Sequence, residues 1–340
     1  MQKFAYNYLQ KLAYDDKIKK KTELTMMNYY IGIDVGGTFV KAGIVDENGN
    51  IVADGKIASE CDKGGNKLAE NAATLVMRLL EKSGISKDQI VGAGMGFPGF
   101  IDSKNGIVVY SNNVRLSDFP VVEIMQAKLG LKVKVANDAN VAALGEKMFG
   151  AGKEYNDMVM ITLGTGVGAG IIIDGKLFEG NRSAGAEIGH MLLVHGGEQC
   201  TCGRKGCFEA YSSATALIRD TRRAMQNHKD SLMWEIGSID NVTGKTPFDY
   251  AKKDKYAAEV VNNYIEMLGS ALTDIANIFR PEAIIIGGGV CAQGDNLIVP
   301  LKQKIQSELF GADFGSPEVV LRIAELGNKA GLLGAAALFM

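Results

Sequence analysis

A glycine-turned β-hairpin occurs twice in this chain, and the repeat strongly constrains the fold. In the first copy an apolar strand enters the turn 34–38, a second strand leaves it, and Asn48-Gly49 starts a third. In the second copy the corresponding turn is 164–168, and Asp174-Gly175 starts the third strand. Asn-Gly and Asp-Gly between apolar runs are typical of β-hairpins. The repeat therefore predicts a duplicated domain whose two glycine turns face each other across a cleft.

The residue types in these two turns indicate a phosphate site. Glycine allows positive φ and lets backbone N–H groups approach a charged ligand closely. Thr38 and Thr165 offer hydroxyl groups to anionic oxygens, and Asp34 can hold water around a phosphate-bound Mg²⁺. A single glycine-rich hairpin is common and usually binds nothing. The repetition, with Asp and Thr embedded, favours phosphate binding.

Length and composition indicate a folded α/β protein of two domains. The chain has 340 residues, 46% of them apolar, with 42 Gly and only 6 Pro. Its formal net charge of −2 gives no chain-wide electrostatic reason to expect a nucleic-acid partner. We find neither an apolar run of membrane-spanning length nor a secretory segment. We therefore expect a soluble, cytoplasmic protein without a membrane partner.

Alternating strands and helices are expected after an N-terminal extension, residues 1–28, that is rich in Lys and Tyr. We assign no function to this extension. Apolar periodicity and Gly or Pro boundaries divide the rest of the chain. Beyond the hairpins, they predict helices at 66–82, 121–129, 137–149, 256–279 and 329–339, and strands at 90–95, 107–110, 131–136 and 283–286.

Three of the five cysteines lie close together, at Cys200, Cys202 and Cys207, and His190 precedes them. Three thiolates and one imidazole are the ligand set of a closed, tetrahedral structural zinc site. Glycines between these cysteines let the chain fold around an ion. The alternatives are disulfides, which are rare in the cytoplasm, and unlinked buried thiols. The compact cluster, poor in core-forming residues, favours zinc.

Asp138 directly follows a predicted strand and stands at a predicted helix start. One interpretation is a helix N-cap. The other is a general base, because residues at the carboxyl ends of strands in α/β sheets face the ligand crevice. A helix N-terminus would also keep its carboxylate ionised.

Two glutamates flank the cysteine-rich loop, Glu187 and Glu209. Their carboxylates can accept hydrogen bonds from polyol hydroxyls, and a metal-pinned loop would hold them rigidly. They can equally be ordinary surface residues. Asn113, after the predicted strand 107–110, is either a sugar ligand or part of a turn.

Together these motifs resemble the repressor, open reading frame and kinase (ROK) family, and within it the zinc-containing bacterial glucokinases. The most specific match is Glu187-Ile-Gly-His190 followed by Cys-x-Cys-Gly-x-x-Gly-Cys-x-Glu at 200–209. The resemblance implies an actin-like ATPase fold, an α/β fold with duplicated ribonuclease H-like halves and an interdomain cleft. It implies a small domain at 29–137, completed by a C-terminal helix at about 326–340, and a large domain at 138–325 with a zinc-binding loop at 187–209.

The resemblance also implies roles for individual residues. Asp138 matches the catalytic base, and His190, Cys200, Cys202 and Cys207 match structural zinc ligands. Positions matching sugar contacts are Gly99, Asn113, Asn137, Asp138, Glu187, His190 and Glu209. Positions matching nucleotide contacts are Asp34, Gly36, Gly37, Thr38, Gly164, Thr165, Gly166, Gly287, Gly288 and Gly289. Many relatives have Lys directly after the Thr of the first phosphate motif; here Phe39 stands there and Lys41 follows, and we assign Lys41 no phosphate contact.

The activity implied is transfer of the γ-phosphate of Mg·ATP to the 6-hydroxyl of glucose, with ATP, Mg²⁺ and structural Zn²⁺ bound. Other sugars remain alternatives: fructose, mannose, allose, N-acetylglucosamine and N-acetylmannosamine. A sugar-responsive repressor is a further alternative, but residues 1–28 are too short for a helix-turn-helix domain. The resemblance alone also predicts a homo-oligomer, a dimer.

Overall fold

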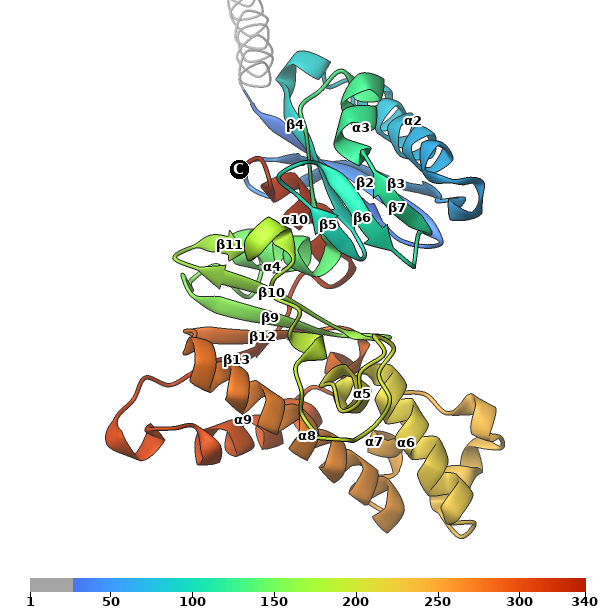
Figure 1. The fold of residues 1–340 in the computed structure, drawn as a ribbon, viewed down its shortest axis with the longest axis vertical. Helices are drawn as coiled ribbons and strands as arrows, with labels where there is room; N and C mark the ends of the chain where they lie inside the picture. The colour runs from blue at the N-terminus through green and yellow to red at the C-terminus, as the bar shows by residue number, and fades with distance from the viewer. Residues whose placement is uncertain (1–26) are drawn as a thin grey trace, which may run out of the picture.

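The computed structural model describes residues 27–340; the greater part of the expected N-terminal extension, residues 1–26, lies outside them. Figure 1 shows two α/β halves, one above the other, each built on a five-stranded sheet. The sheet orders are β3-β2-β1-β4-β8 and β11-β10-β9-β12-β13. In both sheets the first three strands of that half form an antiparallel meander and the last two run parallel to its first strand. The repeated hairpin is therefore the start of a repeated sheet.

The first sheet follows the predicted hairpins closely. Gly49 has a φ of 83°, which the Asn-Gly turn between β2 and β3 requires. Beyond it, α2 presents Leu68, Leu75 and Leu79 to the sheet, and Gly84, left-handed at φ 69°, ends this helix. The elements of this half are β1 (Tyr29–Val35), β2 (Phe39–Asp46), β3 (Ile51–Ala58), α2 (Gly65–Ser83), β4 (Ile90–Phe97), α3 (Val121–Leu129) and β8 (Val133–Asn137).

A small antiparallel sheet is inserted between β4 and α3. It consists of β5 (Phe100–Asp102), β6 (Ile107–Ser111) and β7 (Leu116–Phe119). Buried Ile101 and Val108 anchor it to the core of the first half. The turn after β6 contains Asn113, which lines the cleft described below.

The second half repeats the sheet and adds more helices. Its strands are β9 (Met158–Leu163), β10 (Val167–Ile173), β11 (Lys176–Phe178), β12 (Ala283–Gly287) and β13 (Val320–Ile323). Its helices are α5 (Glu209–Ser212), α6 (Ala214–Asn227), α7 (Thr246–Tyr250), α8 (Lys255–Phe279) and α9 (Asp295–Glu308). The apolar face of α8 packs on the sheet through Leu268, Leu272 and Ile275, all buried. No helix within residues 27–340 is long and apolar enough to cross a membrane.

Two helices lie between the sheets and join the halves. α4 (Asp138–Phe149) packs on β10, and α10 (Ala330–Ala337) packs on β1 and β4, as both views show. Their contact is unusually close because small residues line it. A Cβ added to Gly334 would lie 1.5 Å from the carbonyl oxygen of Val141, and one added to Gly145 would lie 2.5 Å from that of Ala330. Glycine is therefore required where the two helices cross.

Candidate active site at the interdomain cleft

A cleft of about 1050 Å³ opens between the two halves, beside α4 and α10. Residues from both halves line it, and they include most of the residues predicted from the sequence. Those lining residues are Asp34, Gly99, Asn113, Asp138, Gly164, Thr165, Gly166, His190, Glu209, Gly287, Gly288 and Gly289. Asn137 and Glu187 line a smaller cavity of about 60 Å³, which also borders Gly99 and Asp138. Within the described residues, Gly36, Gly37 and Thr38 form the β1–β2 turn but are not among those lining either cavity.

The hydrogen bonds at the start of α4 show whether Asp138 is the N-cap of this helix or is available as a base. Asn137 is the N-cap, because its side-chain Oδ1 accepts hydrogen bonds from the N–H groups of Ala139 and Asn140, at 2.9 and 3.3 Å. The Asn137 amide also donates to the carbonyl of Gly99 at 3.0 Å. Asp138, the first residue of the helix, lines the cleft. Asn137 therefore provides the cap, and the Asp138 carboxylate is available for chemistry.

The surface of Asp138 is exposed to the cleft, yet its carboxyl group lies between the cleft walls with Asp34 and Glu187 nearby. This burial raises the pKa of its carboxyl group to about 6, and the nearby charges of Asp34 and Glu187 act in the same direction. The hydrogen bond from the Ala139 N–H opposes the shift but is outweighed. The helix N-terminus thus favours the ionised form, as expected, but burial has the larger effect on the pKa. A carboxylate with this pKa is ionised at neutral pH and can still accept a proton.

The glycine turns lie around the other end of the cleft. Gly288 has a φ of 96°, and an added Cβ would lie 2.2 Å from the carbonyl oxygen of Leu163, so only glycine fits beside β9. At the β9–β10 turn, the carbonyl of Thr165 accepts a hydrogen bond from Thr215 at 2.8 Å. In the first half, Asp34 pairs with Lys41 at 3.3 Å. The contacts of Gly288 and Thr165 involve the backbone and hold these two segments in place, whereas the Asp34–Lys41 pair joins side chains only.

Glu209 connects the cysteine-rich loop to the second glycine turn. Its Oε2 accepts the N–H of Val167 at 3.0 Å, and its Oε1 accepts the hydroxyl of Thr201 at 2.9 Å. A Cβ on Gly166 would lie 2.3 Å from the same Oε2, which explains the glycine there. The loop and the turn therefore form one rigid unit at the cleft.

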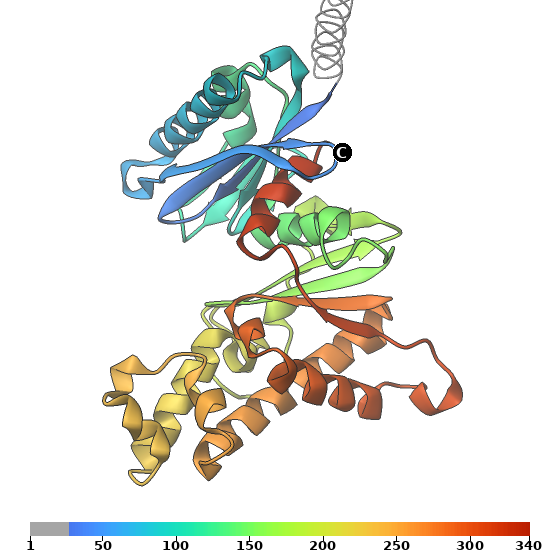
Figure 2. The same cartoon turned by 180° about the vertical axis from the view of Figure 1, so that it is seen from behind.

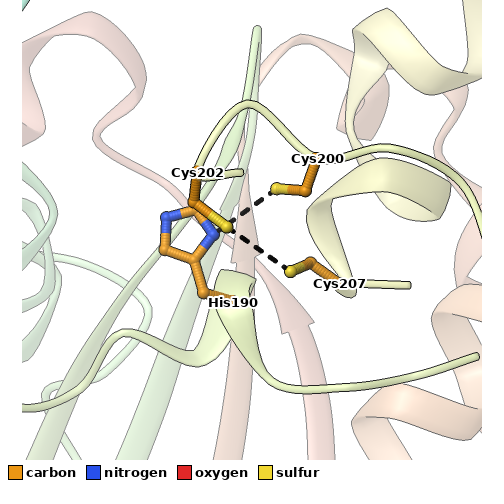
Figure 3. Close-up of side chains that lie close together, drawn as sticks. All are labelled: His190, Cys200, Cys202 and Cys207. Atoms are coloured by element: carbon orange, nitrogen blue, oxygen red, sulfur yellow. Dashed lines mark hydrogen bonds between the residues drawn. The ribbon is translucent and has the colours of Figure 1, made fainter. Parts of the chain in front are cut away.

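The predicted metal ligands converge in the structure (Figure 3). One ligand atom from each of His190, Cys200, Cys202 and Cys207 lies within 4.8 Å of the others. The Sγ atoms of Cys202 and Cys207 are 3.6 Å apart, and Cys200 Sγ lies 3.7 Å from His190 Nδ1. A tetrahedron with metal–sulfur bonds of about 2.3 Å has edges of about 3.7 Å. The four side chains thus fit a closed tetrahedral zinc site, and they are not joined by disulfides.

A bridge between the halves was not predicted from the sequence. The Ser103 hydroxyl, in the β5–β6 turn, lies 2.6 Å from that of Ser183 and 3.0 Å from a carboxylate oxygen of Glu179. Arg182 and Ser183 both adopt positive φ, so this segment has a strained backbone. It leads to Glu187 at the smaller cavity. The partners are about eighty residues apart in the chain and carry no local signal.

These features define a class of protein: a two-domain α/β enzyme with repeated sheets, two glycine turns and a carboxylate of raised pKa in the cleft between its halves. A model of the ROK family matches residues 30–340. The chain belongs to the ROK family.

Its relatives include enzymes of known structure. The chain is 38% identical to a glucokinase of Halalkalibacterium halodurans, over 90% of this chain and 93% of that protein. It is 36% identical to a glucokinase of Thermotoga maritima, over 91% of this chain and 96% of that protein. A ROK family glucokinase from Streptomyces griseus, solved in complex with glucose and AMPPNP, superposes with a TM-score of 0.76 at 35% identity, covering 92% of this chain and 99% of that one. The fold is the actin-like ATPase fold that the resemblance implied.

Proposed function

We propose that this protein is an ATP-dependent glucokinase that transfers the γ-phosphoryl group of Mg·ATP to the 6-hydroxyl of glucose, with Asp138 as general base. The observation that carries the proposal is the position of Asp138, in a cleft that the second glycine turn and the Gly287–Gly289 segment also line. The glucokinases to which the chain is similar over their nearly full length support ATP and glucose as the substrates.

In the reaction, the Asp138 carboxylate accepts the proton of the sugar hydroxyl as the oxygen attacks the γ-phosphorus in line; the bond from the γ-phosphorus to the β–γ bridging oxygen breaks, and ADP leaves. The raised pKa suits this role, because a base is efficient when its pKa lies close to the working pH. Gly99, Asn113, Asn137, Glu187, His190 and Glu209 surround this end of the cavities and would bind the other hydroxyl groups. Orientation of the acceptor oxygen is the main task of these contacts.

The nucleotide would lie along the glycine-lined part of the cleft. We assign phosphate contacts to the two glycine turns with Thr38 and Thr165, and adenosine-side contacts to Gly287, Gly288 and Gly289. Asp34 is a carboxylate at the cleft, of the type that holds Mg²⁺ directly or through water. When bound, Mg²⁺ neutralises charge on the phosphates. The fixed backbone of the turns then provides dipoles that need no reorganisation during transfer.

The zinc ion that we assign to His190, Cys200, Cys202 and Cys207 would have four protein ligands and no open position, so it supplies rigidity and no chemistry. Because Glu209 directly joins this loop to the β9–β10 turn, the loop's rigidity extends to the active site. The dimer and the cytoplasmic location remain predictions, which size measurement and cell fractionation would test.

The test is ATP-dependent phosphorylation across a panel of glucose, fructose, mannose, allose, N-acetylglucosamine and N-acetylmannosamine. We expect glucose to give the highest kcat/KM, and nuclear magnetic resonance of the product to show phosphate on the 6-oxygen. Asp138→Asn should lower kcat by about 10²- to 10⁴-fold. A higher kcat/KM for another sugar would reassign the substrate. Near wild-type turnover by the Asn variant would reject Asp138 as the base.

A further inference from the structure

Glu146 is a fully buried carboxylate to which the proposed reaction gives no role. It lies on α4, two turns after Asp138. Residues 138, 142 and 146 follow at intervals of four, so they share one face of the helix. That face is directed to the cleft, and all three residues line it. The helix that presents the base at its first residue therefore presents a second carboxylate further along the same wall.

All three hydrogen bonds of this carboxylate come from backbone N–H groups. Oε1 accepts the N–H of Leu326 at 2.8 Å. Oε2 accepts the N–H of Glu325 at 3.1 Å and that of Ala151 at 2.8 Å. Hydrogen bonds to an ionised acceptor are stronger than neutral ones. A Cβ on Gly150 would lie 2.0 Å from Oε2, so this glycine leaves room for the carboxylate.

Two of the N–H groups that donate to Glu146 belong to the segment that connects the two halves. Glu325 and Leu326 lie where the chain leaves β13 and approaches α10. The residues that follow, from Gly327 to Gly331, supply part of the cleft wall. A Cβ on Gly331 would lie 3.0 Å from the carboxyl carbon of Asp34, so the first turn of α10 rests against the first phosphate motif. The position of this wall therefore depends on the Glu146 carboxylate.

We propose that Glu146 is a positioning residue for the nucleotide: by fixing the backbone of Glu325 and Leu326, it holds the wall at residues 327–331 against Asp34 in the geometry that ATP requires. The inference rests on the proposed function, because it assumes that the nucleotide occupies this part of the cleft. We expect the effect at the nucleotide end of the cleft, because the hydrogen bonds of Glu146 go to Ala151, Glu325 and Leu326 and, within the described residues, to no sugar-side residue or metal ligand.

The main test is Glu146→Gln, which keeps the shape of the side chain. The Gln amide nitrogen replaces one carboxylate oxygen and cannot accept, so at least one of the three N–H groups loses its partner. We expect KM for ATP, and the Kd of a non-hydrolysable ATP analogue by calorimetry, to rise about tenfold. KM for glucose should stay within about twofold of the wild-type value, because the sugar side is not touched.

Glu282→Gln is a control for the same chemical change at an exposed glutamate outside the cleft. Glu282 Oε2 also accepts two backbone N–H groups, those of Asn156 and Asp157, at 2.5 and 3.0 Å, but Glu282 does not line the cleft among the described residues. This variant should leave nucleotide affinity unchanged. Gly150→Ala is an independent probe, because its new methyl group would displace the carboxylate without removing it. It should weaken ATP binding as Glu146→Gln does, even where the Gln variant folds poorly.

Wild-type affinity for the analogue in folded Glu146→Gln or in Gly150→Ala would overturn the inference. An equal rise in KM for both substrates would also overturn it, since that indicates general damage. If wild-type protein binds the analogue but phosphorylates none of the sugars, the proposed function fails while the positioning role is still measurable by calorimetry. The two ideas are therefore distinguishable in one set of experiments.

Discussion

The raised pKa of Asp138 predicts an acid limb in the pH–rate profile. With a pKa of about 6, the carboxylate is about nine-tenths ionised at pH 7 and about one-tenth ionised at pH 5. We therefore expect kcat/KM for glucose to fall about eight- to tenfold between these pH values. A carboxyl group with the ordinary pKa of 3.8 would lose less than about a tenth of its ionised form over the same range.

The assay measures glucose 6-phosphate in quenched samples at saturating Mg·ATP, so that no coupling enzyme contributes its own pH dependence. Enzyme held at pH 5 and returned to pH 7 must recover full activity, which excludes loss of metal or unfolding. A profile that stays flat from pH 5 to 7.5 would refute the reasoning that burial and the charges of Asp34 and Glu187 perturb this group.

The same shift predicts a pH-dependent stability difference between wild type and Asp138→Asn. Because the folded-state pKa is raised, folding disfavours the ionised form, and the wild-type free energy of unfolding decreases as pH rises from about 4 to 6. The Asn variant has no ionisable group at this position and lacks this decrease. Its free energy of unfolding should therefore rise relative to that of the wild type between about pH 4 and 6. Two pKa units correspond to about 3 kcal/mol, but water in the cleft screens the charge, and we expect about 1 kcal/mol. Urea unfolding at pH 4.5 and pH 8 measures the difference; a pH-independent value would contradict it.

Three further predictions concern other parts of the molecule. Elemental analysis should find about one equivalent of zinc in the wild type, and Cys207→Ser should lose it and raise KM for glucose; a full equivalent retained by the variant would contradict the ligand assignment. Gly334→Ala should lower the free energy of unfolding by about 1–3 kcal/mol in urea, because its Cβ meets the α4 backbone, whereas Gly244→Ala, whose nearest contact is 3.9 Å away, should not. Ser103→Ala should raise KM for glucose about two- to tenfold and leave KM for ATP unchanged; equal changes in both would count against a role of the bridge at the sugar side.

The sequence was sufficient to predict the repeated sheet because hairpin turns are encoded locally. Gly49 and Gly175 adopt the positive φ that their turns require, and the predicted helices and strands are present with small shifts at their ends. The fold and the family implied by the motifs are confirmed. The domain boundaries at 28, 137 and 325 and the roles of the individual site residues remain predictions.

The remaining features depend on residues that meet only in the folded chain. Glu146 and Leu326 are 180 positions apart, and no local pattern links them. The direction of the Asp138 pKa shift likewise depends on how closely the cleft walls approach and on the charges of Asp34 and Glu187. At the start of α4, position alone could not decide whether Asn137 or Asp138 is the N-cap. The side-chain geometry of Asn137 decides it.

The position of α10 has a consequence for the order in which this protein can fold during synthesis. Leu332, Leu333 and Ala336 of α10 complete a buried cluster with Tyr30 and Val45, which leave the ribosome long before them. Until α10 has emerged, the inner face of the first sheet is covered only in part, by α4 at β4 and β8, although all five of its strands have been made. The second sheet can collapse onto α8 and α9 in the meantime. The half of the molecule that is translated first is therefore the half that is completed last.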